Sequence, residues 1–66
     1  MVNEFQVFEV YVKEKEAARE LGMSVDWLRK RRRLKLPPEF HKFGVAVRYT
    51  RSGLNRFASG QKQEVR

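Results

Sequence analysis

The sequence predicts a small α+β domain, because helix and strand signals alternate along a chain of only 66 residues. Two short helices are expected on either side of a glycine, over residues 14–21 and about 24–33. A β-hairpin is expected over residues 40–49, and a further helix from Arg51 to Ser59. The expected architecture is therefore two to three short helices plus a hairpin, with a possible N-terminal strand.

Composition narrows the kinds of site that this chain can build. It has no cysteine and one histidine, His41, so neither a disulfide framework nor a zinc site is expected. It offers no nucleophile–base pair, no paired carboxylates and no phosphate-binding glycine loop, so we expect a binding protein without a cofactor and not an enzyme. No apolar run approaches the roughly 20 residues of a membrane helix and no secretory signal begins the chain, which predicts a cytoplasmic, nucleoid-associated protein.

The net charge of +7 is unevenly distributed along the chain. Residues 1–26 carry three bases and six acids, whereas residues 27–51 carry nine bases and one acid. A concentrated positive half is typical of a nucleic-acid binder. A membrane-surface helix would need a broad apolar face opposite its bases, and the run from Arg29 to Arg33 has none.

The N-terminal residues 1–12 are rich in Val, Phe and Tyr and form an expected arm, with a strand from Phe5 to Val10. Both faces of that strand would be apolar, which is explained either by packing on the domain or by a dimer contact. The domain proper is expected over residues 13–59, and residues 60–66 lack an apolar pattern and are expected to be disordered.

The first helix is predicted to lie close to its neighbours, because Ala17 and Ala18 form a narrow stripe without bulk. Gly22 provides the left-handed conformation that ends the helix and turns the chain. Met23 is expected to fill the gap beneath this turn, and Ser24 to cap the next helix. The charged residues of the first helix are expected to face water; they are Glu14, Lys15, Glu16, Arg19 and Glu20.

A helix, a glycine turn and a second helix with a basic face indicate a helix-turn-helix that binds DNA. In the second helix Leu28 is expected in the core, and Val25 borders the core or touches a base. Trp27 is expected to pack against the C-terminal helix, with contact to the DNA backbone as the alternative. The residues predicted to face the major groove are Ser24, Val25, Asp26, Arg29, Lys30 and Arg33.

The basic side chains of this helix can read guanine or grip phosphates. We expect Arg29 and Lys30 to contact bases. Contacts mainly to phosphates are expected from the last three bases of the run, which are Arg31, Arg32 and Arg33. The alternative for a basic run is a solvated helix face.

The segment after the second helix predicts a wing, which is a hairpin beside a recognition helix. Leu36 is expected in the core, and Pro37 ends the helical geometry. The tip of the hairpin is expected at Gly44, Val45 and Ala46, with the arms on either side. The two cations near phosphates would be Lys42 and Arg48. A purely structural hairpin that closes the core is the alternative.

The closing helix is expected to begin at a cap on Thr50 and to end at Gly60. Its inward side is expected to consist of Leu54, Phe57 and Ala58.

Residues 11–59 resemble the small winged helix-turn-helix proteins of phages and integrated elements. These are the excisionases and the AlpA-like regulators, which are distantly similar to the MerR DNA-binding head. The residues that carry the resemblance are Glu16-Ala17-Ala18, Leu21-Gly22-Met23-Ser24, Leu28, Leu36-Pro37, Phe43-Gly44, Arg48-Tyr49, Leu54 and Phe57.

The resemblance implies sequence-specific binding of double-stranded DNA, with the second helix in the major groove and the wing against the neighbouring minor groove or backbone. Such proteins bind repeated sites, bend DNA, and steer an integrase towards excision or regulate a promoter. The recognition role would fall to Ser24, Val25, Asp26, Arg29 and Lys30, and the wing role to Gly44, Val45 and Arg48.

Three positions depart from the family pattern. Lys13 replaces the usual Ser or Thr cap of the first helix, and Arg31 stands near a position that is usually aliphatic. Gly53 replaces the acid that would complete a capping box after Thr50. The two cap departures should weaken helix starts by about 0.5–1 kcal/mol each.

Three functions therefore stand as expectations: an excisionase that acts beside an integrase and self-associates on repeated sites, a transcriptional regulator, and a basic module that binds protein or RNA without duplex specificity. Single-stranded RNA binding needs exposed aromatic rings for stacking. Most of the eight aromatic residues are expected to be needed for the core of so small a domain.

Overall fold

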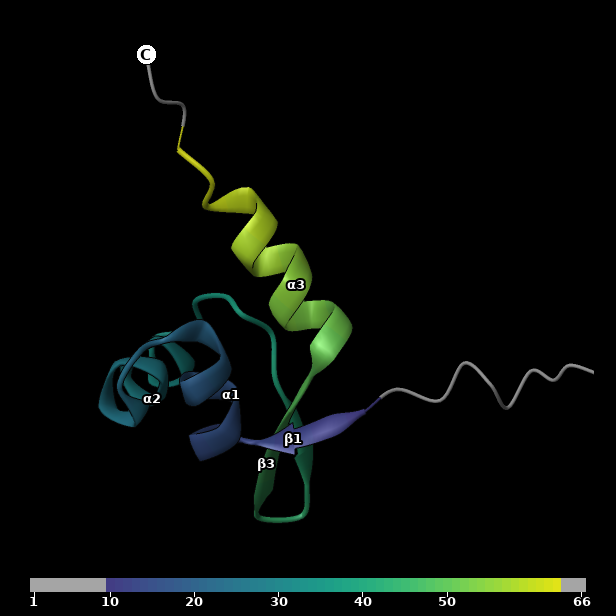
Figure 1. The fold of residues 1–66 in the computed structure, drawn as a ribbon. Helices are drawn as coiled ribbons and strands as arrows, with labels where there is room; N and C mark the ends of the chain where they lie inside the picture. The colour runs from purple at the N-terminus through teal and green to yellow at the C-terminus, as the bar shows by residue number, and fades with distance from the viewer. Residues whose placement is uncertain (1–9, 64–66) are drawn as a thin grey trace, which may run out of the picture.

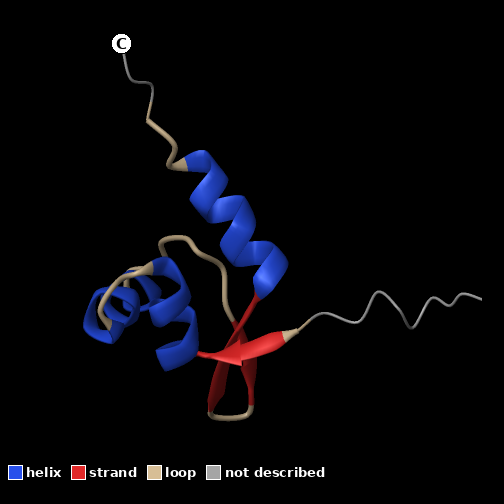
Figure 2. Cartoon of the chain, in the orientation of Figure 1, coloured by secondary structure: helices blue, strands red, loops and turns tan. Residues whose placement is uncertain are grey.

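A computed structural model describes residues 10–63 and has three helices and a three-stranded antiparallel sheet in that part of the chain. The expected α+β class is confirmed (Figures 1 and 2). In chain order the elements are β1 (Tyr11–Lys13), α1 (Glu14–Leu21), α2 (Val25–Arg33), β2 (His41–Phe43), β3 (Ala46–Thr50) and α3 (Arg51–Gly60).

The sheet has β3 at its centre, with β1 and β2 as the two edges. The β2–β3 pairing places Phe43 opposite Ala46, so the turn contains only Gly44 and Val45. Gly44 has φ +66°, which suits the first position of a two-residue hairpin turn. The expectation that Ala46 belongs to the tip is therefore wrong, because Ala46 is the first residue of β3.

Among the described residues, the N-terminal strand β1 begins at Tyr11. β1 covers Tyr11–Lys13, whereas the strand predicted from Phe5 to Val10 falls on residues outside the described part, apart from Val10, which is not in a strand. Val12 lies opposite Tyr49 in the sheet and is buried, which explains why this short segment is extended.

The core lies between the sheet and the paired helices α1 and α2. Ala17 and Ala18 are buried there, as expected from their lack of bulk, and they let α1 approach α2 and β3 closely. In Figure 1, α1 and α2 lie together on one side, while α3 extends from the end of β3, away from the β2–β3 turn. The full set of buried apolar residues is Val12, Ala17, Ala18, Leu28, Tyr49 and Leu54.

Three apolar residues expected inside are exposed instead: Met23, Leu36 and Ala58. The reason is clearest at Leu36, whose backbone N–H donates to the Arg31 carbonyl (2.8 Å) and is thereby held at the end of α2. Pro38, two residues further on, takes the buried position.

The third helix begins at a hydroxyl cap, as predicted. The side chain of Thr50 accepts a hydrogen bond from the Gly53 N–H (3.0 Å). A Cβ on Gly53 would lie 2.8 Å from the Thr50 hydroxyl oxygen, so a side chain at this position would disturb the cap. Gly53 therefore leaves room for the hydroxyl cap of α3. Gly60, expected as the stop, is the last residue of α3.

Between residues 10 and 63, no helix combines the length and apolar character needed to cross a membrane. The tail expected over residues 60–66 lies partly outside the described residues, since the description ends at Gln63.

Candidate nucleic-acid interface

The turn between α1 and α2 has the predicted construction. Gly22 has φ +70°, and its N–H donates to the Arg19 carbonyl (3.0 Å), while the Met23 N–H donates to the Ala18 carbonyl (2.9 Å). These two bonds close α1 and redirect the chain. Ser24 then caps α2 by accepting a hydrogen bond from the Trp27 N–H (3.1 Å).

The five consecutive bases at the end of α2 divide into two groups. Successive residues of a helix are rotated by about 100°, so the run from Arg29 to Arg33 cannot lie on one face. Arg31 and Arg32 are partly buried on the flanks of the helix. The exposed residues form one contiguous arc, the outward arc, which consists of Asp26, Arg29, Lys30 and Arg33.

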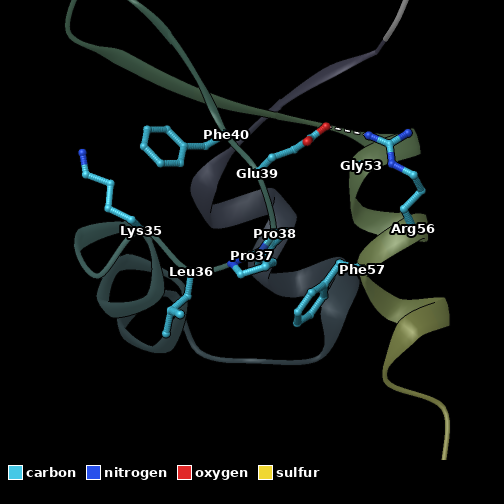
Figure 3. A pocket seen from close by; sticks show the side chains of 9 residues that line it. All are labelled: Lys35, Leu36, Pro37, Pro38, Glu39, Phe40, Gly53, Arg56 and Phe57. Carbon is cyan, nitrogen blue, oxygen red and sulfur yellow. Dashed lines mark hydrogen bonds and ion pairs between the residues drawn. The ribbon is translucent and has the colours of Figure 1, made fainter.

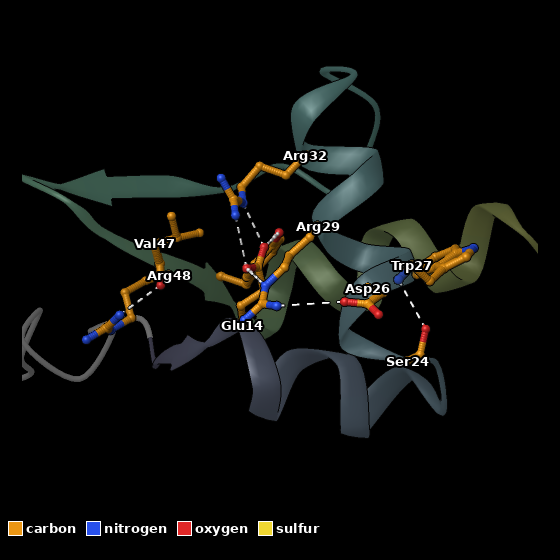
Figure 4. A network of polar contacts seen from close by, with 9 residues as sticks. Glu14, Ser24, Asp26, Trp27, Arg29, Arg32, Val47 and Arg48 are labelled. Carbon is orange, nitrogen blue, oxygen red and sulfur yellow. Dashed lines mark hydrogen bonds and ion pairs between the residues drawn. The ribbon is translucent and has the colours of Figure 1, made fainter.

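Arg32 holds α2 against the rest of the domain. Its Nε lies 2.7 Å from Glu14 Oε2 and its Nη2 lies 3.2 Å from Glu14 Oε1, a bidentate pair between α2 and the first residue of α1. The hydroxyl of Tyr49, on β3, donates to Glu14 Oε2 at 2.9 Å. One carboxylate therefore joins α1, α2 and the sheet (Figure 4).

The expectation that Glu14 faces water is wrong, since its side chain is only 12% exposed. Burial acts to raise the pKa of this carboxyl, but hydrogen bonds from Arg32 and Tyr49 and the charges of Arg32 and Arg29 outweigh it, so the pKa of Glu14 is lowered. Burial and then the bond to Glu14 raise the pKa of Tyr49. The hydrogen bond to Glu14 raises the pKa of Arg32.

Arg31 fixes the opposite flank of α2. Its guanidinium carbon lies 5.0 Å from the ring centre of Trp27 and 5.3 Å from that of Phe57, and its Nε donates to the Pro37 carbonyl. The Trp27 and Phe57 rings are 6.2 Å apart, which confirms the prediction that Trp27 packs against the C-terminal helix. Arg31 and Arg32 thus contact the protein itself.

Arg29 has ion pairs within the domain, but its side chain remains accessible to a ligand. Its Nε lies 3.5 Å from Glu14 Oε1 and its Nη1 lies 3.7 Å from Asp26 Oδ1, yet the side chain is 51% exposed. Figure 4 shows Arg29 and Arg32 both pointing from α2 toward Glu14. Two long ion pairs orient the Arg29 guanidinium and leave donors for a ligand.

The other members of the outward arc have fewer ties. Lys30 and Arg33 are exposed and form no ion pair or side-chain hydrogen bond with residues 10–63. The Asp26 side chain is 91% exposed, and its one ion pair among residues 10–63 is with Arg29. Of the remaining predicted groove residues, Ser24 is exposed with its hydroxyl in the cap, and Val25 is half-buried against the core. The surface is cationic overall, with a single acid near the start of α2.

The hairpin separates its two cations. Lys42 lies opposite Val47, whose side chain packs against the core, so Lys42 is on the side of the sheet that carries the helices. Arg48 lies opposite His41 and therefore projects from the other face, where its Nη1 donates to the Val47 carbonyl (2.8 Å). At the turn, Gly44 and Val45 are both exposed.

A hollow of about 510 Å³ lies between the segment that follows α2 and α3. Leu36 and Phe57 line it, and an ion pair between Glu39 and Arg56 joins the two sides (Figure 3). Leu36, which was expected in the core, lines this hollow instead.

Glu14 is the most important residue of this site that the sequence did not indicate. It is 18 residues from Arg32 in the chain, so no local spacing could indicate the pair. Comparisons with models of protein families, with curated proteins and with solved structures found no match for this chain.

Proposed function

We propose that this chain is a winged helix-turn-helix protein that binds double-stranded DNA in a sequence-specific manner and is not an enzyme. One observation carries the proposal. Of five adjacent bases, two are held by the protein and three, Arg29, Lys30 and Arg33, share an exposed arc at the end of a capped helix. Lys30 and Arg33 have no acidic partner among residues 10–63, and Arg29 is paired only through two long contacts, so this cluster favours a polyanion as its partner.

The dimensions of α2 suit the major groove. The groove is about 12 Å wide and admits one α-helix. The rise from Asp26 to Arg33 is about 10 Å, which corresponds to roughly three base pairs. The outward arc is the exposed side of α2 and is therefore the face available to DNA.

The roles within the arc follow from the restraints on each side chain. Arg29, oriented by two carboxylates, is suited to a bidentate contact with guanine, and Lys30 is suited to a neighbouring base. Arg33, near the end of α2, is suited to a phosphate. Arg32 is left out of the contact set because its guanidinium is bonded to Glu14.

The hairpin supplies the second contact. Lys42 is on the side of the sheet that carries the helices, and the exposed Gly44–Val45 turn is at the end of the hairpin. Both would approach the adjacent backbone or minor groove when α2 lies in the major groove. Arg48 is on the opposite face and is left out of this contact.

The resemblance of residues 11–59 makes an excisionase the preferred role, with an integrase as the protein partner and self-association on repeated sites in nucleoid DNA. An AlpA-like transcriptional regulator is the second candidate. Selection of bound sites from random duplexes, with and without a neighbouring integrase, separates them. Tandem sites support the excisionase, and a lone palindrome supports a dimeric regulator.

Duplex binding itself is tested with Arg29→Ala/Lys30→Ala in a gel shift over a salt series. We expect this double variant to lose at least about tenfold in affinity, because each specific contact contributes about 1–3 kcal/mol. Lys15→Ala/Arg19→Ala removes the same charge from exposed positions on α1 and should change affinity by less than about threefold. Equal affinity of the wild type and the Arg29→Ala/Lys30→Ala variant would overturn the assignment.

A further inference from the structure

The face of the sheet that is turned away from α1 and α2, the outer sheet face, carries a second cluster of basic and aromatic side chains. The strand register places Lys13, Arg48 and His41 in one row across all three strands. Tyr11 is two residues before Lys13, and Phe43 is two residues after His41, so both project from the same face as this row.

The aromatic residues of the outer sheet face are not part of the core. Tyr11 is 47% exposed and Phe43 is 55% exposed. The Tyr11 ring centre lies 5.5 Å from that of His41 and 5.3 Å from that of Phe43, and both contacts are edge-to-face. Tyr11 and Phe43 are therefore two of the eight Phe, Tyr and Trp residues that the core does not use. They support one another and remain open to solvent.

The charge of this face is positive. The three strands contain no aspartate or glutamate, while Lys13 and Arg48 each bring a cation to the row. Only one donor of the Arg48 guanidinium is engaged by the Val47 carbonyl, and an arginine has five. Exposed rings interleaved with cations are the combination that single-stranded nucleic acids require.

We propose that the outer sheet face binds a short stretch of single-stranded nucleic acid. Unpaired bases stack on the rings of Tyr11 and Phe43, and Lys13 and Arg48 contact the phosphates between them. Duplex DNA cannot use this face in the same way, because its bases are stacked on one another. The site is separate from the outward arc of α2 and does not depend on duplex binding.

Two other partners fit the face less well. An acidic protein segment would use the cations but has no need of exposed rings, and an apolar segment would use the rings but has no need of the cations. With either of these partners, binding should be kept when a ring is replaced by an aliphatic side chain of similar apolar character. Binding of unpaired bases should be weakened by the same replacement, and this difference is the basis of the test.

The experiment measures fluorescence anisotropy of a labelled 12-nucleotide oligothymidine and of an abasic strand of equal length, at low salt. We expect the abasic strand to bind at least about fivefold more weakly, because stacking contributes to each bound base. Phe43→Leu and Tyr11→Leu should each weaken oligothymidine binding by about fivefold or more, since leucine has no ring. Val45→Ala, which removes exposed apolar surface at the turn, should leave it unchanged.

The two binding surfaces are distinguished by a reciprocal comparison. Phe43→Leu should keep the affinity for duplex DNA, and Arg29→Ala/Lys30→Ala should keep the affinity for oligothymidine within about threefold. Equal binding of the abasic strand, or full retention of oligothymidine binding in both leucine variants, would overturn the proposal. Thermal unfolding of each variant shows that the fold is intact, and the Tyr11 variant provides the test if the Phe43 variant is unstable.

Discussion

Arg32 and Arg33 are adjacent residues of the same type, yet their surroundings differ completely. Arg32 is bonded to a carboxylate that also receives the Tyr49 hydroxyl, whereas Arg33 is exposed and has no partner among residues 10–63. The rotation of about 100° between them puts one on the flank of α2 and the other on the outward arc. A basic run is thus a mixture of scaffold and contact residues, and its composition alone does not separate them.

Arg32→Ala should have the largest effect on stability in this comparison. We expect the free energy of unfolding to fall by about 2–3 kcal/mol, because the largely buried Glu14 carboxylate loses two charged hydrogen bonds. Urea unfolding at pH 7 measures the change. Arg33→Ala removes the same charge from the exposed arc and should cost less than about 0.5 kcal/mol. Equal losses in the two variants would show that the division of the run is incorrect.

Arg31→Ala should cost about 1–2 kcal/mol, since the guanidinium contacts two aromatic rings and donates to the Pro37 carbonyl. The matched variant is Lys30→Ala, whose side chain is exposed and has no hydrogen bond, ion pair or ring contact within the described part of the chain. Chemical unfolding monitored by Trp27 fluorescence should separate the two, and a larger loss for Lys30→Ala would contradict the account.

Glu14→Gln should make the free energy of unfolding depend less steeply on pH in the acid range. Its effect on stability should be smaller than that of Arg32→Ala or Arg31→Ala, because glutamine keeps part of the hydrogen bonding. The pKa of Glu14 is lower in the folded protein than in an unfolded chain. Its contribution is therefore complete above the unfolded pKa and is lost as the pH falls through the folded pKa. Below about pH 5 the wild type should lose stability more steeply than Glu14→Gln.

Glu16→Gln is the matched control, because the Glu16 side chain is 45% exposed and its one ion pair among residues 10–63 is a long contact of 3.9 Å to Arg19. Its pH profile of urea midpoints should follow that of the wild type. Parallel profiles for all three proteins would mean that Glu14 does not contribute as an anion.

Lys35→Gly should have the smallest effect and should stabilise the end of α2. Lys35 has φ +61°, a left-handed conformation that glycine adopts without strain. The unfolded chain gains freedom on the same substitution, so the net gain should be only about 0.5–1 kcal/mol. A lower thermal midpoint for Lys35→Gly would contradict this explanation of the helix end.

The sequence allowed much of the local structure to be predicted, because its signals act over four residues or fewer. The positive φ at Gly22 and Gly44 and the hydroxyl caps at Ser24 and Thr50 were all expected and are present. The placement of Leu28 in the core followed from its helical spacing.

Features that depend on distant contacts were beyond such reasoning. The Glu14–Arg32 pair joins residues 18 positions apart, and Glu14 itself has the surroundings of an exposed helix residue in the sequence. The position of β1 depends on Val12 meeting Tyr49 across the sheet. Phe43 is exposed because the helices cover the other face of the hairpin. The alternation of side chains along a strand shows which residues share a face, but not which of the two faces is covered.

We propose that the outward arc contacts DNA and that the flanks of α2 do not. The slope of log affinity against log salt concentration for a duplex site distinguishes the two surfaces. We expect Arg33→Ala to reduce that slope by about 0.9, the value for one lost phosphate contact, and Arg31→Ala to leave it unchanged. A reduced slope for Arg31→Ala together with an unchanged slope for Arg33→Ala would contradict the claim.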